Sequence, residues 1–218
     1  MISNIETIEQ SFIFNGKTYK INRVKNLDAL VDQVDEQLFN EDERLPYWAE
    51  LWPSAIGFSR YLAKNPELLQ NKSVLELGCG LGLTSLIIST QEPATFLVTD
   101  YEQDALYHLA GNFKLNRLSS PEMQLLDWRK PNLKKNFEVI IASDVLYEKR
   151  FFEPLLQLFK IFLADNGYIL LAEPNRPIAK IFFEMLSSEN FKFNNSIEQV
   201  EQDGKIIDVH IYKIQVFK

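Results

Sequence analysis

From residue 73 onward, short apolar runs alternate with stretches in which apolar residues recur at helical spacing. A short apolar run bounded by polar or turn residues is typical of a buried strand. Such runs lie at residues 73–77, 96–100, 123–126, 137–142 and 168–172. Helical spacing predicts helices at residues 53–64, 83–90, 106–113, 152–163 and 178–186.

Short apolar strands that alternate with amphipathic helices indicate a parallel sheet with helices on both faces. The tail from Phe191 to the end carries Asp203-Gly204 in its middle, which predicts a closing β-hairpin. Together these segments predict an α/β fold of the Rossmann-like kind. Its sheet would be mostly parallel and seven-stranded, with helices on both faces and an antiparallel C-terminal hairpin at the edge.

The first part of the chain has a different pattern. Two β-prone runs flank Asn15-Gly16, a dipeptide that favours a type I′ hairpin turn. Apolar residues at helical spacing between Leu27 and Leu38 then predict a helix, with Asn26 as its N-cap. We therefore expect an N-terminal extension at residues 1–44, a β-hairpin and a helix packed on the core, and one domain at residues 45–218.

Charge and composition narrow the classes of partner. The chain is 46% hydrophobic and 24% charged, which is ordinary for a globular protein, and its formal net charge is −7. Proteins that bind nucleic acids usually carry clustered Lys and Arg, and no such cluster is visible, so a nucleic-acid substrate is disfavoured. An acidic face would suit a basic protein partner, although this net charge also fits ordinary solubility.

A metal site and membrane insertion are not expected. Cys79 is the only cysteine, which excludes an intrachain disulfide and a thiolate metal cluster, and His108 and His210 are far apart in sequence. The N-terminus lacks the basic and apolar regions of a signal peptide. Apolar runs are also shorter than a membrane span. We expect a cytoplasmic protein, with a monomer favoured.

A glycine-rich turn follows the strand at residues 73–77. It reads Gly78-Cys79-Gly80-Leu81-Gly82 and leads into a predicted helix. Glycines let the backbone approach a ligand closely, and a helix N-terminus offers free N–H groups. In the dinucleotide fingerprint G-x-G-x-x-G the third glycine comes one residue later, at the place of Leu83, which disfavours a nicotinamide or flavin cofactor.

An acidic residue ends the next predicted strand. Asp100 follows Gly80 by 20 residues, and a carboxylate at such a strand end can accept hydrogen bonds from ribose hydroxyls. The alternative is that Asp100 caps the helix that follows.

These residues resemble the S-adenosylmethionine-dependent methyltransferases with a Rossmann-like fold, over about residues 46–218. That family has an acidic residue two positions before its first glycine, like Glu76, and an acidic second strand end, like Asp100. Its third strand commonly ends in an acidic residue near the adenine, like Asp127. The resemblance implies S-adenosylmethionine as the cofactor, held by Trp52, Glu76, Gly78, Cys79, Gly80, Gly82, Asp100, Tyr101, Asp127, Trp128 and Ser143.

Two further segments bear on the methyl acceptor. Asp144 and Tyr147 follow the fourth strand, and residues 46–54 include Trp52. Together they resemble the protein-lysine methyltransferases marked by an Asp-x-x-Tyr motif. That branch includes enzymes acting on the electron transfer flavoprotein β subunit. The resemblance implies that Asp144 and Tyr147 are catalytic and that a protein lysine is the acceptor. An Asn-Pro-Pro-Tyr motif is absent, which disfavours glutamine and adenine acceptors.

The chemistry of lysine methylation fits these residue types. Neutralising a lysine of pKa about 10.4 near pH 7.4 costs roughly 4 kcal/mol, and desolvation lowers that pKa. Tyr47, Trp48 and Tyr147 could form an aromatic wall, and cation–π contact with the methylated product contributes about 0.5–2 kcal/mol. Because a carboxylate favours the charged amine, Asp144 is better suited to orient the amine than to act as a general base.

Other interpretations stay open at this level. Asp144 could cap the next helix, and Tyr147, Trp48 and Trp52 could serve packing alone. Residues 173–176 could form part of a substrate rim or merely a loop stopped by a proline. For the whole protein, the alternatives are a small-molecule N-methyltransferase on the same fold, a non-catalytic scaffold and, ranked last, a nicotinamide oxidoreductase.

Overall fold

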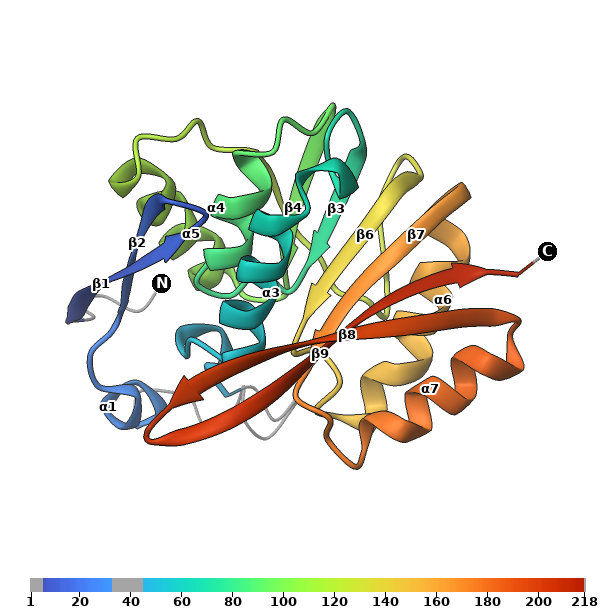
Figure 1. The fold of residues 1–218 in the computed structure, drawn as a ribbon. Helices are drawn as coiled ribbons and strands as arrows, with labels where there is room; N and C mark the ends of the chain where they lie inside the picture. The colour runs from blue at the N-terminus through green and yellow to red at the C-terminus, as the bar shows by residue number, and fades with distance from the viewer. Residues whose placement is uncertain (1–5, 33–44, 218) are drawn as a thin grey trace.

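The computed structural model describes residues 6–32 and 45–217, and its centre is a seven-stranded sheet (Figure 1). Strands β3 to β7 run parallel, β9 is antiparallel to β7, and β8 is antiparallel to β9 at the edge. This arrangement confirms the predicted fold class. In spatial order the strands are β5 (Glu122–Leu125), β4 (Thr95–Asp100), β3 (Ser73–Leu77), β6 (Phe137–Ser143), β7 (Leu163–Glu173), β9 (Lys205–Val216) and β8 (Phe191–Gln202).

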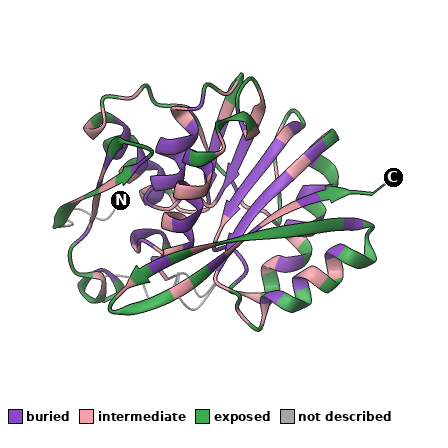
Figure 2. Cartoon of the chain, viewed as in Figure 1, coloured by how far each residue is buried: buried purple, intermediate pink, exposed green. Residues whose placement is uncertain are grey.

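Helices cover both faces of the sheet, as Figure 1 shows. Successive residues of a strand point to opposite faces, so Val74 of β3 packs in one buried cluster and Leu75 in the other. The first cluster includes residues of α3 (Pro53–Lys64), α4 (Leu83–Ser89) and α5 (Gln103–Leu115). The second includes residues of α6 (Phe152–Phe162) and α7 (Ala179–Ser188). The central strands are therefore buried on both sides, as Figure 2 shows.

The N-terminal hairpin forms a small sheet of its own. Strands β1 (Thr7–Phe14) and β2 (Lys17–Val24) pair antiparallel around Asn15 and Gly16. Both turn residues have positive φ, 47° and 75°, as the predicted type I′ turn requires.

Asn112 of α5 joins this hairpin to the core. Its Oδ1 accepts a hydrogen bond from the amide of Asn22 at 2.8 Å. Its Nδ2 donates to the carbonyl oxygen of Leu81 at 2.9 Å, so one buried side chain links the hairpin to the glycine-rich turn.

The helix predicted between Leu27 and Leu38 is described only at its start. Helix α1 (Leu27–Val31) begins after Asn26, whose side chain accepts from the amide of Ala29 and thus confirms the predicted N-cap. The rest of that predicted helix, from residue 33, lies outside the described residues. The predicted division between residues 44 and 45 falls at the edge of the same gap and stays a prediction.

The predicted end of the helix at residues 152–163 was wrong by one residue, because the chain passes directly into a strand there. The apolar spacing extended the helix to Leu163, but α6 ends at Phe162. Leu163 is extended, with φ −74° and ψ 125°, and pairs with Phe137 in the sheet. Regular pairing of β7 resumes at Tyr168, where the strand was predicted, after an interruption that includes Asn166 at φ 61°. A side-chain period cannot show where a helix passes directly into a strand.

Within residues 6–32 and 45–217, three short 3-10 turns connect the main elements. They are η1 (Tyr47–Ala49), η2 (Pro66–Leu68) and η3 (Lys149–Phe151). The C-terminal hairpin turns at Asp203 and Gly204, both at positive φ, as predicted.

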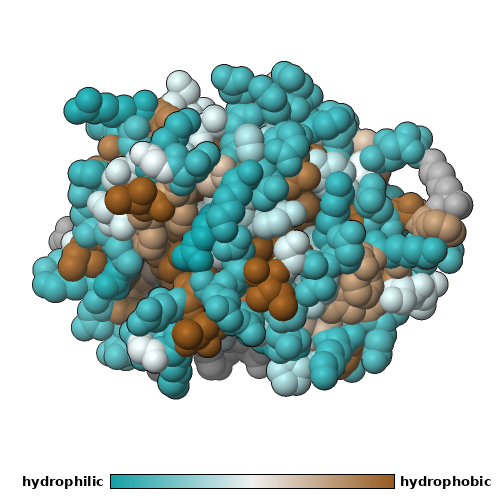
Figure 3. All heavy atoms as spheres, viewed as in Figure 1, coloured by the Kyte–Doolittle hydropathy of each residue, from teal (hydrophilic) through white to brown (hydrophobic). Residues whose placement is uncertain are grey.

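The visible surface shows small apolar patches separated by hydrophilic side chains (Figure 3). Within the described ranges, no helix is both long and apolar enough to cross a lipid bilayer. The cellular location of the protein stays a prediction.

Candidate functional site

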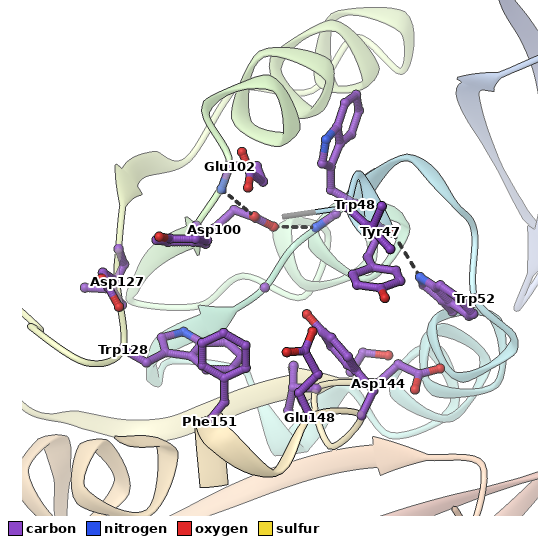
Figure 4. Close-up of a pocket in the computed structure, with 18 of the residues that line it drawn as sticks. Tyr47, Trp48, Trp52, Asp100, Glu102, Asp127, Trp128, Asp144, Glu148 and Phe151 are labelled. Carbon is purple, nitrogen blue, oxygen red and sulfur yellow. Dashed lines mark hydrogen bonds between the residues drawn. The ribbon is translucent and has the colours of Figure 1, made fainter. Parts of the chain in front are cut away.

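A pocket lies at the carboxyl ends of β3, β4 and β6, where ligands bind in open parallel sheets (Figure 4). It encloses about 880 Å³ of space, open solvent at its mouth included. Most of the predicted site residues line it: Trp52, Gly78, Gly80, Asp100, Tyr101, Asp127, Trp128, Ser143, Asp144 and Tyr147. Glu76, Cys79 and Gly82 are not among its lining residues.

The glycine-rich turn forms the floor of the pocket. Gly78, Gly80 and Gly82 all have positive φ, at 69°, 51° and 83°. L side chains rarely adopt this conformation, so the turn depends on glycine. A Cβ on Gly82 would also lie 2.0 Å from Cδ1 of Leu109. Gly82 therefore serves helix packing, whereas Gly78 and Gly80 face the pocket.

Asp100 connects the turn to the end of β4. Its Oδ2 accepts a hydrogen bond from the amide of Gly80, and its Oδ1 accepts one from the amide of Glu102, both at 2.9 Å. Burial raises the pKa of Asp100, and these two amides oppose the shift. Helix α5 starts at Gln103 with Glu102 as its N-cap, so Asp100 is not the capping residue.

Glu76 and Cys79 support the turn away from the pocket. Glu76 is 2% exposed, and Ser85 Oγ donates to its Oε2 at 2.5 Å. Burial raises the pKa of Glu76 to about 8. Burial likewise raises the pKa of the Cys79 thiol well above its ordinary value, so the thiolate needed for nucleophilic chemistry is disfavoured.

The end of the pocket beside β5 carries Asp127 and Trp128 (Figure 4). Arg129 Nε donates to Asp127 Oδ1 at 2.8 Å, and Arg129 Nη2 donates to the Tyr101 hydroxyl at 2.6 Å. The ring of Phe151 meets the indole of Trp128 edge to face, with centroids 5.9 Å apart. This end of the pocket thus combines the flat apolar indole of Trp128 with the carboxylate of Asp127.

Asp144 lies at the opposite end, beside Tyr47 and Trp52 (Figure 4). It directly follows β6 at φ 59°, and its amide donates to the carbonyl oxygen of Ala172 at 2.8 Å. Its side chain is 3% exposed and forms an ion pair with Arg176 through Oδ1. The next helical turn, η3, has Glu148 as its N-cap, so Asp144 does not cap it.

Aromatic rings form a wall next to Asp144. The rings of Tyr47 and Tyr147 have centroids 5.1 Å apart, and those of Tyr47 and Trp52 lie 6.5 Å apart. Trp52 Nε1 donates to the carbonyl oxygen of Tyr47 at 3.0 Å, which fixes both residues. Burial raises the pKa of Tyr147, and the nearby Glu148 adds to the shift. Trp48 also lines the pocket and packs on His108, with centroids 4.9 Å apart.

Three buried polar atoms of the pocket residues have no hydrogen-bond partner in the part of the chain that the structure describes. They are Trp128 Nε1, Ser143 Oγ and Asp144 Oδ2. Leaving such an atom unsatisfied costs roughly 1–3 kcal/mol, so orphaned atoms in a pocket indicate a ligand with polar groups.

Sequence reasoning missed the loop between β6 and α6. Glu148, Arg150 and Phe151 line the pocket, and their position just after Asp144 and Tyr147 was the available signal. Arg176 lies in the segment at residues 173–176 that was left open between rim and loop. Among the described residues, no group of His, Cys, Asp and Glu side chains could hold a metal ion.

Comparison with known proteins places this geometry in context. A family model described as "Lysine methyltransferase" matches residues 33–189. The human electron transfer flavoprotein β subunit lysine methyltransferase is 32% identical over 61% of this chain and 50% of its own length. The chain thus spans about half the length of this relative. A protein N-terminal and lysine N-methyltransferase from Schizosaccharomyces pombe is 29% identical over 70% of this chain and 68% of its own.

Solved structures share the fold at low sequence identity. A 16S rRNA methyltransferase from T. thermophilus, in complex with AdoMet and guanosine, has a TM-score of 0.65 and 13% identity, over 97% of this chain and 51% of its own. Magnesium protoporphyrin IX methyltransferase from Synechocystis, with bound SAM, has a TM-score of 0.57 and 14% identity, over 83% of this chain and 85% of its own. Likeness at this identity shows the Rossmann-like fold alone.

Proposed function

This chain belongs to the lysine methyltransferase family, and we propose that it transfers a methyl group from S-adenosylmethionine to the side-chain amine of a lysine in a protein. The observation that carries the proposal is the position of Asp144. This buried carboxylate lines the same pocket as Asp100 and the glycine-rich turn, and its Oδ2 has no partner among the described residues.

The lining residues fit the parts of S-adenosylmethionine. Asp100 would accept from the ribose hydroxyls, Trp128 and Asp127 would flank the adenine, and the turn at Gly78 and Gly80 allows the close approach of a ligand to backbone. Ser143 Oγ and Trp128 Nε1 offer hydrogen bonds that the described residues leave unmade. When bound, this cofactor supplies a methyl group on a cationic sulfonium, from which an amine can displace it.

The residues around Asp144 fit an acceptor amine. Tyr47, Trp52 and Tyr147 would surround a lysine side chain that fills that end of the pocket and displace water from it, and desolvation favours the neutral lysine that can react. Asp144 Oδ2 would accept one N–H of the amine and so aim its lone pair. Orientation of two reactants can contribute up to about 7–11 kcal/mol, and this alignment is the principal task of the protein.

A protein acceptor is supported by the mouth of the pocket. Tyr47 and Tyr147 are each 37% exposed, so the aromatic wall is open to a side chain that enters from outside. The human relative is described as acting on the electron transfer flavoprotein β subunit, and that protein is a sensible first acceptor to try.

The test is transfer of a labelled methyl group. Wild type and Asp144→Asn would be incubated with methyl-labelled S-adenosylmethionine and a lysate from cells lacking this chain, and proteins would be hydrolysed to quantify methyl-lysine. We expect Asp144→Asn to lose at least about a hundredfold of the transfer rate. Binding of S-adenosylhomocysteine, measured by calorimetry, should change by less than about threefold. Asp208→Asn, on the exposed part of β9, is the matched control and should behave as wild type.

Other outcomes identify other functions. Label found only in the small-molecule fraction would favour a small-molecule N-methyltransferase. Wild type that binds neither S-adenosylmethionine nor S-adenosylhomocysteine would indicate a non-catalytic scaffold, and the proposal would be wrong.

A further inference from the structure

Asp144 is a buried carboxylate that lines the pocket together with Tyr47, Trp52 and Tyr147, and Arg176 is its ion-pair partner. The two residues come from the ends of neighbouring strands, since Asp144 follows β6 and Arg176 lies just after β7. Arg176 contacts only Oδ1 of the carboxylate, and Oδ2 is buried without a partner in the described part of the chain. The pair is therefore neutral overall but still offers one acceptor atom.

Arg176 is held in this place from two further sides. Its amide donates to Oε2 of Glu173 at 2.8 Å, and Glu173 is 1% exposed at the end of β7. Its guanidinium carbon lies 5.9 Å from the ring centre of Trp52. Burial lowers the pKa of Arg176, yet a guanidinium keeps its charge at neutral pH. The backbone of this short loop and the ring of Trp52 thus direct a fixed positive charge at Asp144.

The charge balance matters for an amine substrate. A lone buried carboxylate would stabilise an ammonium group and raise its pKa, which would hold a lysine in its unreactive form. A carboxylate whose charge is balanced no longer favours the ammonium, but it can still accept an N–H from a neutral amine.

We propose that Arg176 is a positioning residue that balances the charge of Asp144, so that the pocket selects the acceptor lysine as a neutral amine. This inference rests on the proposed function, because it concerns the amine that the pocket would accept. It assigns Arg176 no contact with the reacting atoms.

Binding of small amines to the protein saturated with S-adenosylhomocysteine tests the proposal without an acceptor protein. The probes are n-pentylamine, which mimics the lysine side chain and is an ammonium at pH 7.5, and the uncharged 1-pentanol. We expect Arg176→Met to bind n-pentylammonium at least about tenfold more tightly than wild type by calorimetry. Its affinity for 1-pentanol should stay within about twofold.

Three variants control the measurement. Arg176→Lys keeps the charge and should behave as wild type, and Arg176→Gln repeats the loss of charge in case the methionine variant does not fold. In the double variant Asp144→Asn with Arg176→Met, the increase in affinity for n-pentylammonium over wild type should disappear, because the carboxylate of Asp144 is no longer there to attract it.

The pH profile adds a readout that a merely structural residue would not change. Between pH 7.5 and 9.5, the affinity of wild type for n-pentylamine should rise by about tenfold per pH unit, as the neutral fraction grows. Arg176→Met should give a flat profile. Other charged or titratable groups of the pocket are Tyr47, Asp100, Tyr101, Glu102, Asp127, Tyr147, Glu148 and Arg150. Glu173 accepts a hydrogen bond from the amide of Arg176 and interacts with His210, and Glu76 lies beneath the turn. The double variant retains all of them and separates their effect from that of Asp144.

The outcomes exclude one another. The inference is overturned if wild type and Arg176→Met bind n-pentylammonium with equal affinity, or if neither protein binds it measurably. It is also overturned if the affinity of Arg176→Met for 1-pentanol rises as much as its affinity for the ammonium, since Arg176 would then only fill space. Failure of wild type to bind S-adenosylhomocysteine overturns the proposed function instead.

Discussion

The amide of Gly80 donates a hydrogen bond to Oδ2 of Asp100 at 2.9 Å, across 20 positions of the chain. Gly80 belongs to the turn after β3, and Asp100 is the last residue of β4. This hydrogen bond therefore links two parts of the proposed cofactor site. The backbone at Gly80 could approach a ligand closely, and the carboxylate of Asp100 could accept hydrogen bonds from ribose hydroxyls. These two parts of the proposed cofactor site are thus hydrogen-bonded directly to each other.

Asp100→Asn should weaken binding of S-adenosylhomocysteine by at least about tenfold. The asparagine keeps the size of the side chain, but whichever oxygen becomes the NH2 group would face the backbone amide of Gly80 or of Glu102 and could no longer accept a hydrogen bond. Calorimetry measures the effect. Asp104→Asn, in the first turn of α5 and not among the lining residues, should leave the affinity unchanged. Equal affinity of wild type and Asp100→Asn would remove Asp100 from the cofactor site.

Gly82→Ala should lower the free energy of unfolding by about 2–4 kcal/mol, as expected for overpacking together with strain at positive φ. The new Cβ would lie 2.0 Å from Cδ1 of Leu109, at a φ of 83°. Urea denaturation measures the change. The matched control is Gly111→Ala. Gly111 is helical and no atom lies within 4 Å of the added Cβ, so the free energy of unfolding of this variant should rise by about 0.5–1 kcal/mol.

The burial of Glu76 leads us to expect that the stability of the protein depends on pH. Its pKa rises on folding from 4.5 to about 8, so between these values the folded protein holds a proton that the unfolded chain has lost. Stability from this group is full below the unfolded pKa and falls as pH rises, by up to about 1.4 kcal/mol per unit. Wild type should therefore lose stability relative to Glu76→Gln between about pH 5 and 8. A constant difference in urea denaturation over that range would contradict the shift.

Tyr147 should act as a neutral wall residue rather than as a base. Burial raises its pKa, so the phenol stays protonated throughout the range in which lysine methylation would be assayed. Tyr147→Phe should keep the transfer rate within about tenfold and leave its pH profile unchanged. Tyr147→Ala should lower the transfer rate further, because the ring contact with Tyr47 disappears and water can enter the pocket. A profile that changes in the phenylalanine variant would assign the hydroxyl a role in proton transfer.

Much of the site was predictable from local sequence because parallel strands bring their carboxyl ends together. Asp100, Ser143 and Asp144 each end or follow an apolar strand, so their approach follows once the strands are located. The turn at residues 78–82 was equally readable, since its backbone needs glycine at three positions. The hairpin turns at Asn15 and Asp203 were predictable for the same reason, since both turns need residues that adopt positive φ.

The local sequence alone thus determined the strands, most of the helices and the residues at the strand ends, because these depend on side-chain period and on backbone conformation. Only the tertiary structure decided which charges meet. The pairing of Arg176 with Asp144 spans 32 positions and depends on the adjacency of β6 and β7 and on the ring of Trp52. The burial of Glu76 beneath the turn depends in the same way on α4. A contact between distant residues is set by the packing of whole elements, and no local pattern records it.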